Sequence, residues 1–177
     1  EAGGWGGRRE LEDRSEYKAG REAQGGIGEG VGAVGGHEED AGGEEEGCGA
    51  LRSPAYYCAD NAAAGAETVG LGGVLGALGG HPENAGVQEE GCGALRTLAY
   101  KADYKAAIAA QGGIGAVLGA MGGHPENAGV QEEGCGALRT LAYNRADHKA
   151  ELAAPGGIGV VLVAMGGHPE NAGVQEE

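Results

Sequence analysis

Residues 124–143 read HPENAGVQEEGCGALRTLAY, and the same twenty residues stand unchanged at 81–100. A degraded copy starts at His37 with HEEDAGGEEEGCGALR, and residues 168–177 repeat the opening HPENAGVQEE. Repetition with a period of this length is typical of arrays in which each unit buries its apolar side against its neighbours. The sequence therefore predicts a stack of similar units.

Alignment of the copies places equivalent residues 43 or 44 positions apart. The equivalent sets are Ile27, Leu71, Ile114 and Ile158; His37, His81, His124 and His168; and Cys48, Cys92 and Cys135. The predicted organisation is one array over residues 1–177. It comprises the end of a repeat at 1–14, full repeats at 15–58, 59–101 and 102–145, and the start of a repeat at 146–177. Because the chain begins and ends inside a repeat, we expect a segment of a longer array, or ends that neighbouring subunits cover.

Three helical segments are predicted within the best-preserved unit. The first spans residues 103–110, with Asp103 as its N-cap, and ends at a Gln-Gly-Gly sequence. The second spans residues 114–121, where apolar residues recur with helical spacing. Gly-Gly-His-Pro ends it at 122–125, and Pro125 is placed to open the third helix. The third runs from near Glu126 or Val130 to Tyr143.

The N-terminal copies match this pattern less well. Arg21 stands where a later copy has the apolar Ile108, and Pro54 falls inside the long helix of the second copy. A proline there is expected to kink or end the helix. Glycine is abundant throughout, at 41 of 177 residues. Inside a helix each glycine costs about 0.5–1 kcal/mol relative to alanine, and the sequence shows no benefit that offsets this cost.

The predicted unit has two short helices followed by a long one, in a period just above forty residues. This arrangement resembles the armadillo repeat. The Gly-Gly-Ile junction and the long segment QEEGCGALRTLAY carry the resemblance, which covers essentially the whole chain. It implies an all-α fold, a right-handed α-solenoid whose third helices line a concave groove. In that family the groove binds extended or helical segments of other proteins.

The chain departs from the family at two groove positions. Peptide-binding members carry a tryptophan or other large residue on the third helix and an asparagine four residues later. The tryptophan position here holds Gly49, Gly93 and Gly136, and the asparagine position holds Ser53, Thr97 and Thr140. A hydroxyl cannot offer the paired donor and acceptor of an amide, so recognition of nuclear-localisation signals is disfavoured.

A row of charged residues accompanies these hydroxyls on the predicted groove. Arginine recurs at Arg52, Arg96 and Arg139, and glutamate recurs about two turns earlier at Glu45, Glu89 and Glu132. Arginines spaced in this way suit carboxylates of a partner in bidentate geometry. The alternative is a solvated helix face, which is the more common role of surface charges.

The histidines and cysteines are interpreted structurally. Equivalent histidines of neighbouring units lie roughly 10 Å apart, the usual spacing of packed helices, which is too far to share one metal ion. We expect His37, His81, His124 and His168 in the turn before the third helix. The cysteines at 48, 92 and 135 stand where the family has an apolar residue, so we expect small buried side chains. Single recurring cysteines favour reduced thiols in an intracellular, cytoplasmic protein.

Composition limits the classes of partner. The net charge is −15 and the pI about 4.6, which argues against nucleic acid and favours a basic partner. No apolar run is long enough to span a bilayer, so membrane insertion is not expected. No residue pattern predicts catalysis, a cofactor or a bound metal.

The sequence thus favours a non-catalytic scaffold that binds a partner protein or peptide along the third-helix face. The expected contact residues are Arg52, Arg96, Arg139, Ser53, Thr97, Thr140, Glu89 and Glu132. The first alternative is a structural spacer subunit in a large assembly, bound through its convex face or its ends. The second is a nuclear-import adaptor, against which the missing tryptophans and asparagines count.

Overall fold

The computed structural model describes residues 40–57, 69–154 and 156–176. Within these ranges the chain is helical and has no strand, which confirms the predicted all-α class. The helices are α3 (Ala41–Tyr57), α5 (Val69–Gly80), α6 (Ala85–Leu98), α7 (Ala102–Ala110), α8 (Gly113–Gly123), α9 (Ala128–Ala142), α10 (Ala146–Leu152), α11 (Gly157–Gly167) and α12 (Ala172–Glu176). The predicted part-repeat at 1–14, most of the repeat at 15–58 and the start of the repeat at 59–101 lie outside the described residues.

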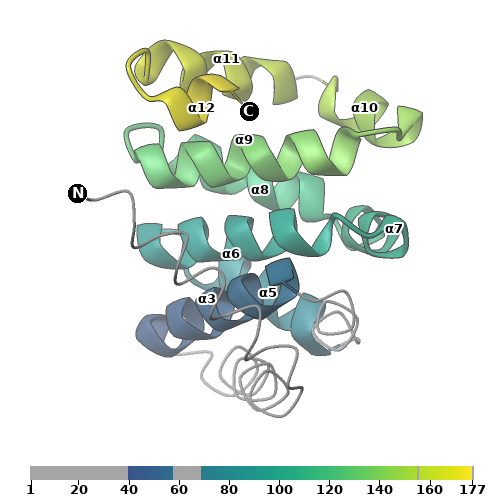
Figure 1. Ribbon diagram of the computed structural model, residues 1–177. Helices are drawn as coiled ribbons and strands as arrows, with labels where there is room; N and C mark the ends of the chain where they lie inside the picture. The colour runs from purple at the N-terminus through teal and green to yellow at the C-terminus, as the bar shows by residue number, and fades with distance from the viewer. Residues whose placement is uncertain (1–39, 58–68, 155, 177) are drawn as a thin grey trace, which may run out of the picture.

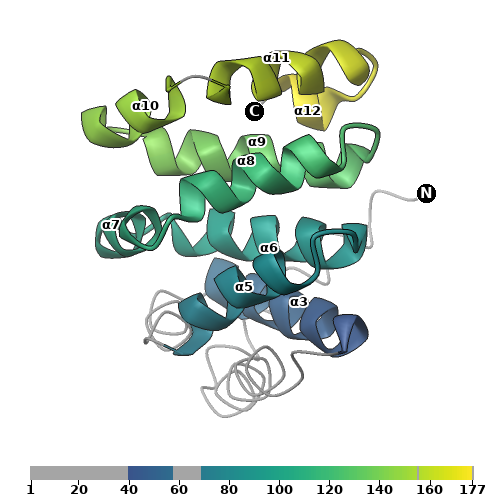
Figure 2. The same ribbon diagram turned by 180° about the vertical axis from the view of Figure 1, so that it is seen from behind.

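The helices form two layers, with the shorter helices along one edge (Figure 1). The long helices α3, α6 and α9 lie side by side, and α6 makes its most extensive contacts with α3 and α9. Figure 2 shows α5, α8 and α11 on the opposite side of the stack. The short helices α7 and α10 lie at the edge where α6 and α9 end. Successive repeats therefore place equivalent helices next to one another.

The long helices begin at an asparagine cap. The backbone of Asn127 is extended, with φ −89° and ψ 106°, and its side-chain oxygen accepts a hydrogen bond from the Val130 N–H at 3.0 Å. Asn84 caps α6 in the same way. This cap satisfies one of the N–H groups that a helix start leaves without a partner. The prediction that Pro125 opens the third helix is wrong, since α9 begins at Ala128, between the two predicted starts.

The preceding helices agree with the prediction in type but differ at their ends. α7 starts at Ala102 with Lys101 as N-cap and no side-chain cap, so the prediction of Asp103 as N-cap is wrong. Asp103 lies in the first turn instead, where a carboxylate is favoured by the helix dipole. Gly112 ends α7 as predicted, with φ +81°, a conformation that glycine adopts without strain. α3 continues past Pro54 to Tyr57, so the proline does not end that helix.

A buried glutamine explains why α8 continues through two glycines beyond its predicted end. The carbonyl of Met121 would normally accept from the N–H four residues later, but that residue is Pro125, which has none. Gln131 of α9 supplies the missing donor: its Nε2 donates to the Met121 carbonyl at 2.8 Å and to the His124 carbonyl at 2.8 Å. The preceding repeat has the same arrangement, in which Gln88 donates to the Leu78 and His81 carbonyls.

The histidines join one repeat to the next. His124 and His168 follow directly after α8 and α11, which confirms their predicted place in the turn. The Nε2 of His124 donates to the Pro82 carbonyl of the preceding repeat at 2.7 Å, and His168 donates to the Pro125 carbonyl at 2.8 Å. The ring therefore ties neighbouring turns together at one edge of the stack.

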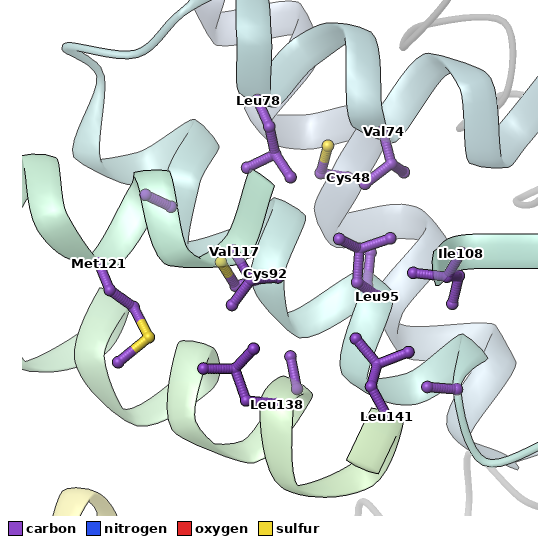
Figure 3. Packing of buried hydrophobic residues seen from close by; sticks show 14 of the residues in the cluster. Cys48, Val74, Leu78, Cys92, Leu95, Ile108, Val117, Met121, Leu138 and Leu141 are labelled. Atoms are coloured by element: carbon purple, nitrogen blue, oxygen red, sulfur yellow. The ribbon is translucent and has the colours of Figure 1, made fainter. Parts of the chain in front are cut away.

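The core lies between the two layers and is shared by successive repeats (Figure 3). Val74 and Leu78 of α5 pack with Leu95 of α6, and Val117 of α8 continues the same cluster toward Leu138 of α9. Cys48 and Cys92 lie in this core, as expected for small buried side chains. Each layer of helices thus buries its apolar side on its neighbours.

In the described part of the chain, no single helix is long and apolar enough to cross a membrane. Two pairs of consecutive helices, α7 with α8 and α10 with α11, have the length and apolar composition of a membrane span when the two helices are taken together. Each pair is bent by 71° at the break between its helices.

Candidate functional site: the third-helix face and a tyrosine hollow

The predicted arginines lie at equivalent positions on the three long helices. Arg52 is on α3, Arg96 on α6 and Arg139 on α9. Their spacing follows the repeat, so the structure brings them onto the same face of adjacent helices. Ser53 is also on α3, but its side chain lies outside the described residues.

Two of these arginines form a charged network with glutamates of the following repeats. Arg52 Nη1 donates to both carboxylate oxygens of Glu90 at 3.3 Å, and Nη2 donates to Glu133 Oε1 at 2.5 Å. Arg96 Nη1 donates to the other oxygen of Glu133 at 3.4 Å. Glu133 is buried and lies on the second long helix from Arg52. The network therefore spans α3, α6 and α9.

Glycine makes this network possible. A Cβ at Gly93 would lie 2.7 Å from Cδ of Arg52, and a Cβ at Gly136 would lie 2.7 Å from Cζ of Arg96. Contacts this short would force the arginine aside. At Gly93 and Gly136, the arginine of the preceding repeat thus occupies the space that a side chain would take.

The predicted glutamates lie against the start of the next long helix. A Cβ at Gly129, in the first turn of α9, would overlap the Glu89 carboxylate, and Gly173 of α12 has the same relation to Glu132. The first turn of a helix favours a negative charge because its N–H groups point outward there. Glu89 and Glu132 therefore contact the neighbouring repeat, while Glu90 and Glu133 hold the arginines.

The predicted hydroxyls are largely enclosed. Thr97 and Thr140 are buried, and their hydroxyls donate to the carbonyls of Gly93 and Gly136 at 2.9 and 2.8 Å. Such bonds to the residue four positions earlier are common for threonine within helices. A partner would therefore meet these hydroxyls chiefly as acceptors.

Glu89 is the group on this face whose ionisation opposes folding. Its burial raises its pKa and repulsion from Glu90 adds to this, while Arg52 acts in the opposite direction. The first turn of α9 also favours the ionised form. The raised pKa shows that desolvation and the neighbouring carboxylates outweigh the effect of Arg52.

Replacing Glu89 with glutamine is therefore expected to stabilise the protein at neutral pH. A carboxyl with a raised folded pKa binds more protons when folded, so its contribution to stability falls as pH rises from about 4.3 through the folded pKa. The thermal midpoint of E89Q should exceed that of the wild type at pH 7 and converge with it below pH 4. Glu126→Gln, in an exposed turn, removes the same charge and is the matched control. An equal gain in both variants would contradict a specific effect at Glu89.

A hollow of about 460 Å³ opens at the edge of this face, where α6 and α9 end. It is lined by Tyr100, Lys105, Arg139, Thr140 and Tyr143. Arg139 and Thr140 were predicted contact residues. The two tyrosines and Lys105 were not, although Tyr56, Tyr100 and Tyr143 repeat in the sequence at the end of the long helix. That periodic tyrosine was the signal that could have identified them.

The tyrosines are the large exposed side chains of the hollow. Tyr100 is 60% exposed and Tyr143 66% exposed. Lys105 on α7 is only 8% exposed, and its Nζ donates to the Tyr143 carbonyl at 3.2 Å. The same ammonium lies 5.2 Å from the centroid of the Tyr143 ring, within the range of a cation–π contact. The hollow therefore combines aromatic surface with a fixed positive charge.

The cysteines lie apart from this face. Burial raises the pKa of Cys48 and of Cys92 to about 12, and nearby glutamates add to the shift. A thiol with so high a pKa holds its proton at neutral pH and is a poor nucleophile. These cysteines act as small apolar side chains of the core.

Comparison with known proteins found no match to this chain among protein-family models, curated proteins or solved structures.

Proposed function

We propose that this protein is a non-catalytic scaffold that holds a partner protein or peptide along the face formed by α3, α6 and α9. The observation that carries the proposal is the register of these helices: equivalent side chains recur on adjacent long helices. A segment lying across them would meet the same chemistry at each repeat. Such repeated contacts are how extended faces of helical arrays bind partners.

The proposed architecture is an armadillo-type, right-handed α-solenoid. Its support is the order of short, short and long helices, repeated with a period of 43 or 44 residues. In that architecture the long helices would line the concave side. The protein is proposed to act inside the cell, without a cofactor.

The chemistry of the face points to a partner that contributes carboxylates or hydrogen-bond donors. Arg52 and Arg96 are held by glutamates, so they are oriented before any partner arrives. An oriented guanidinium loses less side-chain entropy on binding than a mobile one. The import-adaptor alternative is weaker, because arginine side chains fill the space where a tryptophan ladder would stand.

The test is partner binding by the full chain carrying both Arg96→Ala and Arg139→Ala. We expect retention of a partner in a pull-down to fall at least fivefold. The control is the double variant Arg145→Ala and Lys149→Ala, which removes the same charge from α10 and its N-cap residue. Retention equal to that of the wild type in the Arg96/Arg139 variant would refute the assignment of this face.

A structural spacer in a larger assembly is the second candidate, and the surface of α11 favours it. Ile158, Leu162, Val163 and Met165 are exposed there. An apolar patch of this kind often marks a contact with another protein. This candidate requires Ile158→Ala to weaken assembly while the isolated chain stays folded, which sedimentation of the variant would check.

A further inference from the structure

We propose that the hollow between Tyr100, Tyr143, Lys105 and Arg139 binds an acidic peptide segment of a partner protein. In this arrangement a carboxylate of the segment pairs with Lys105 and Arg139, and a neighbouring apolar side chain packs on the tyrosine rings. The inference names the partner chemistry at one end of the third-helix face and therefore rests on the proposed function.

The first observation behind the proposal is that Lys105 is held in a fixed position at the hollow. Its side chain is nearly enclosed, and the Tyr143 carbonyl and ring hold the ammonium in place at the hollow. An ammonium has three N–H donors, and the Tyr143 carbonyl takes one of them. Burial lowers the pKa of Lys105, and the nearby Arg145 adds to this. The positive charge of the ammonium is therefore not fully balanced by its surroundings. A carboxylate from a partner would supply the missing negative charge.

The second observation is that the basic residues gather at the edge of the molecule where the hollow lies. From residue 69 onward, every lysine and arginine lies within 96–105 or 139–149, the segments beside the hollow. The acidic residues of the same edge are Asp103 on α7 and Asp147 and Glu151 on α10, and Asp147 is paired with Arg145 at 2.8 Å. The glutamates at 83, 89, 90, 126, 132 and 133 belong to the turns and N-terminal halves of the long helices. The edge with the hollow is thus the basic edge of an acidic chain.

The net charge of −15 does not prevent this binding. At physiological ionic strength charges more than about 8 Å apart are largely screened, so the local cations dominate at the hollow. The same net charge disfavours nucleic acid, which would lay a long row of phosphates over the acidic part of the surface.

The third observation is that the hollow has the size and the aromatic surface to take an apolar side chain. A volume of about 460 Å³ holds a few side chains, and the tyrosines at its rim offer rigid surface for an apolar residue. Aromatic rings with a polar edge are favoured at protein interfaces for this reason. An acidic residue beside a leucine matches both parts of the hollow.

The experiment is a fluorescence-anisotropy titration of the full chain with a labelled peptide of alternating Glu-Leu and Gly-Ser pairs. A second peptide carries glutamine in place of each glutamate. We expect the glutamate peptide to bind at least tenfold more tightly. Lys105→Met, which keeps the buried stem, should weaken its binding about tenfold, and Tyr143→Ser should weaken it severalfold. The matched control is Lys149→Met, which replaces an exposed lysine on α10 and should have little effect.

Several outcomes would overturn the proposal. These are equal affinity for the two peptides, equal loss in Lys105→Met and Lys149→Met, or no binding to the wild type. Tyr100→Ser, at an exposed position, keeps the test valid if Lys105→Met fails to fold. Self-association of the wild type that Lys105→Met abolishes would identify the occupant as a second copy and reject a separate partner.

Comparing Arg96→Ala with Lys105→Met distinguishes binding at the hollow from binding along the wider third-helix face. Arg96 lies on the third-helix face but does not line the hollow. If Arg96→Ala weakens capture of a partner while Lys105→Met does not, the face stands and the hollow is rejected. If Lys105→Met weakens binding while Arg96→Ala does not, the hollow stands as an isolated site and the wider face is rejected.

Discussion

Replacing Gln131 with leucine is expected to lower the free energy of unfolding by about 2–4 kcal/mol. Gln131 is 1% exposed and donates to the carbonyls of Met121 and His124. The Met121 carbonyl depends on this donor because Pro125 provides no N–H. Leucine has a similar volume, so the loss comes from unsatisfied carbonyls and not from a cavity. Urea unfolding followed by circular dichroism measures the change.

The chain contains its own control for this prediction. Gln175 makes the same two bonds, to the Met165 and His168 carbonyls, but it is exposed. Water can replace the lost donor there, so Gln175→Leu should cost less than about 1 kcal/mol. Equal losses at the two positions would show that burial does not decide the value of this hydrogen bond.

Replacing Ile114 with alanine is expected to cost about 2–5 kcal/mol of stability. Ile114 is 1% exposed and belongs to the core cluster between α8 and its neighbours. The substitution removes buried methylene groups and leaves a cavity that the packed helices fill only in part. Chemical denaturation of the variant, with the slope checked for a change in cooperativity, measures the effect.

The matched control is Ile158→Ala, at the equivalent position of the next repeat. Ile158 is 55% exposed, and in the described part of the chain no helix packs over α11 as α11 packs over α8. Its replacement in the isolated chain should therefore cost less than about 1 kcal/mol. A loss as large as that of Ile114→Ala in a monomeric sample would contradict the packing described for α11.

The pair Ile114 and Ile158 also shows where sequence reasoning stops. Both are isoleucine in nearly the same local sequence, and both were predicted to be equivalent. Their helices do form at equivalent positions. Their burial differs because it depends on which helix packs over each one, and that neighbour is remote in the sequence.

For the same reason, the sequence predicted only part of the candidate site. The positions of Arg52, Arg96 and Arg139 on one face follow from the repeat alone. Their partners did not, since Arg52 reaches Glu133, 81 residues away. The adjacent pair Glu89 and Glu90 shows the difficulty: one carboxylate lies over Gly129 and the other holds Arg52. Neighbours in sequence point in different directions around a helix, and only the packing of α3, α6 and α9 assigns their partners.

The packing also accounts for some of the glycines. Gly93 and Gly136 leave space for the arginine of the preceding repeat, and Gly129 leaves space for Glu89. These close approaches provide a benefit that the sequence did not show. At Gly72, Gly76, Gly115 and Gly119 a Cβ would meet nothing, and the structure gives no reason for glycine there.

The sequence by itself determined the helical class, the repeat period and the order of short, short and long helices. Apolar spacing and glycine stops act within a few residues, so they can be recognised along the chain. Only the tertiary structure decided that Gln131 replaces the donor missing at Pro125, that Arg52 crosses Gly93, and that Tyr100 and Tyr143 frame a hollow. Those arrangements join residues of different helices, and their distances are set by how the helices pack.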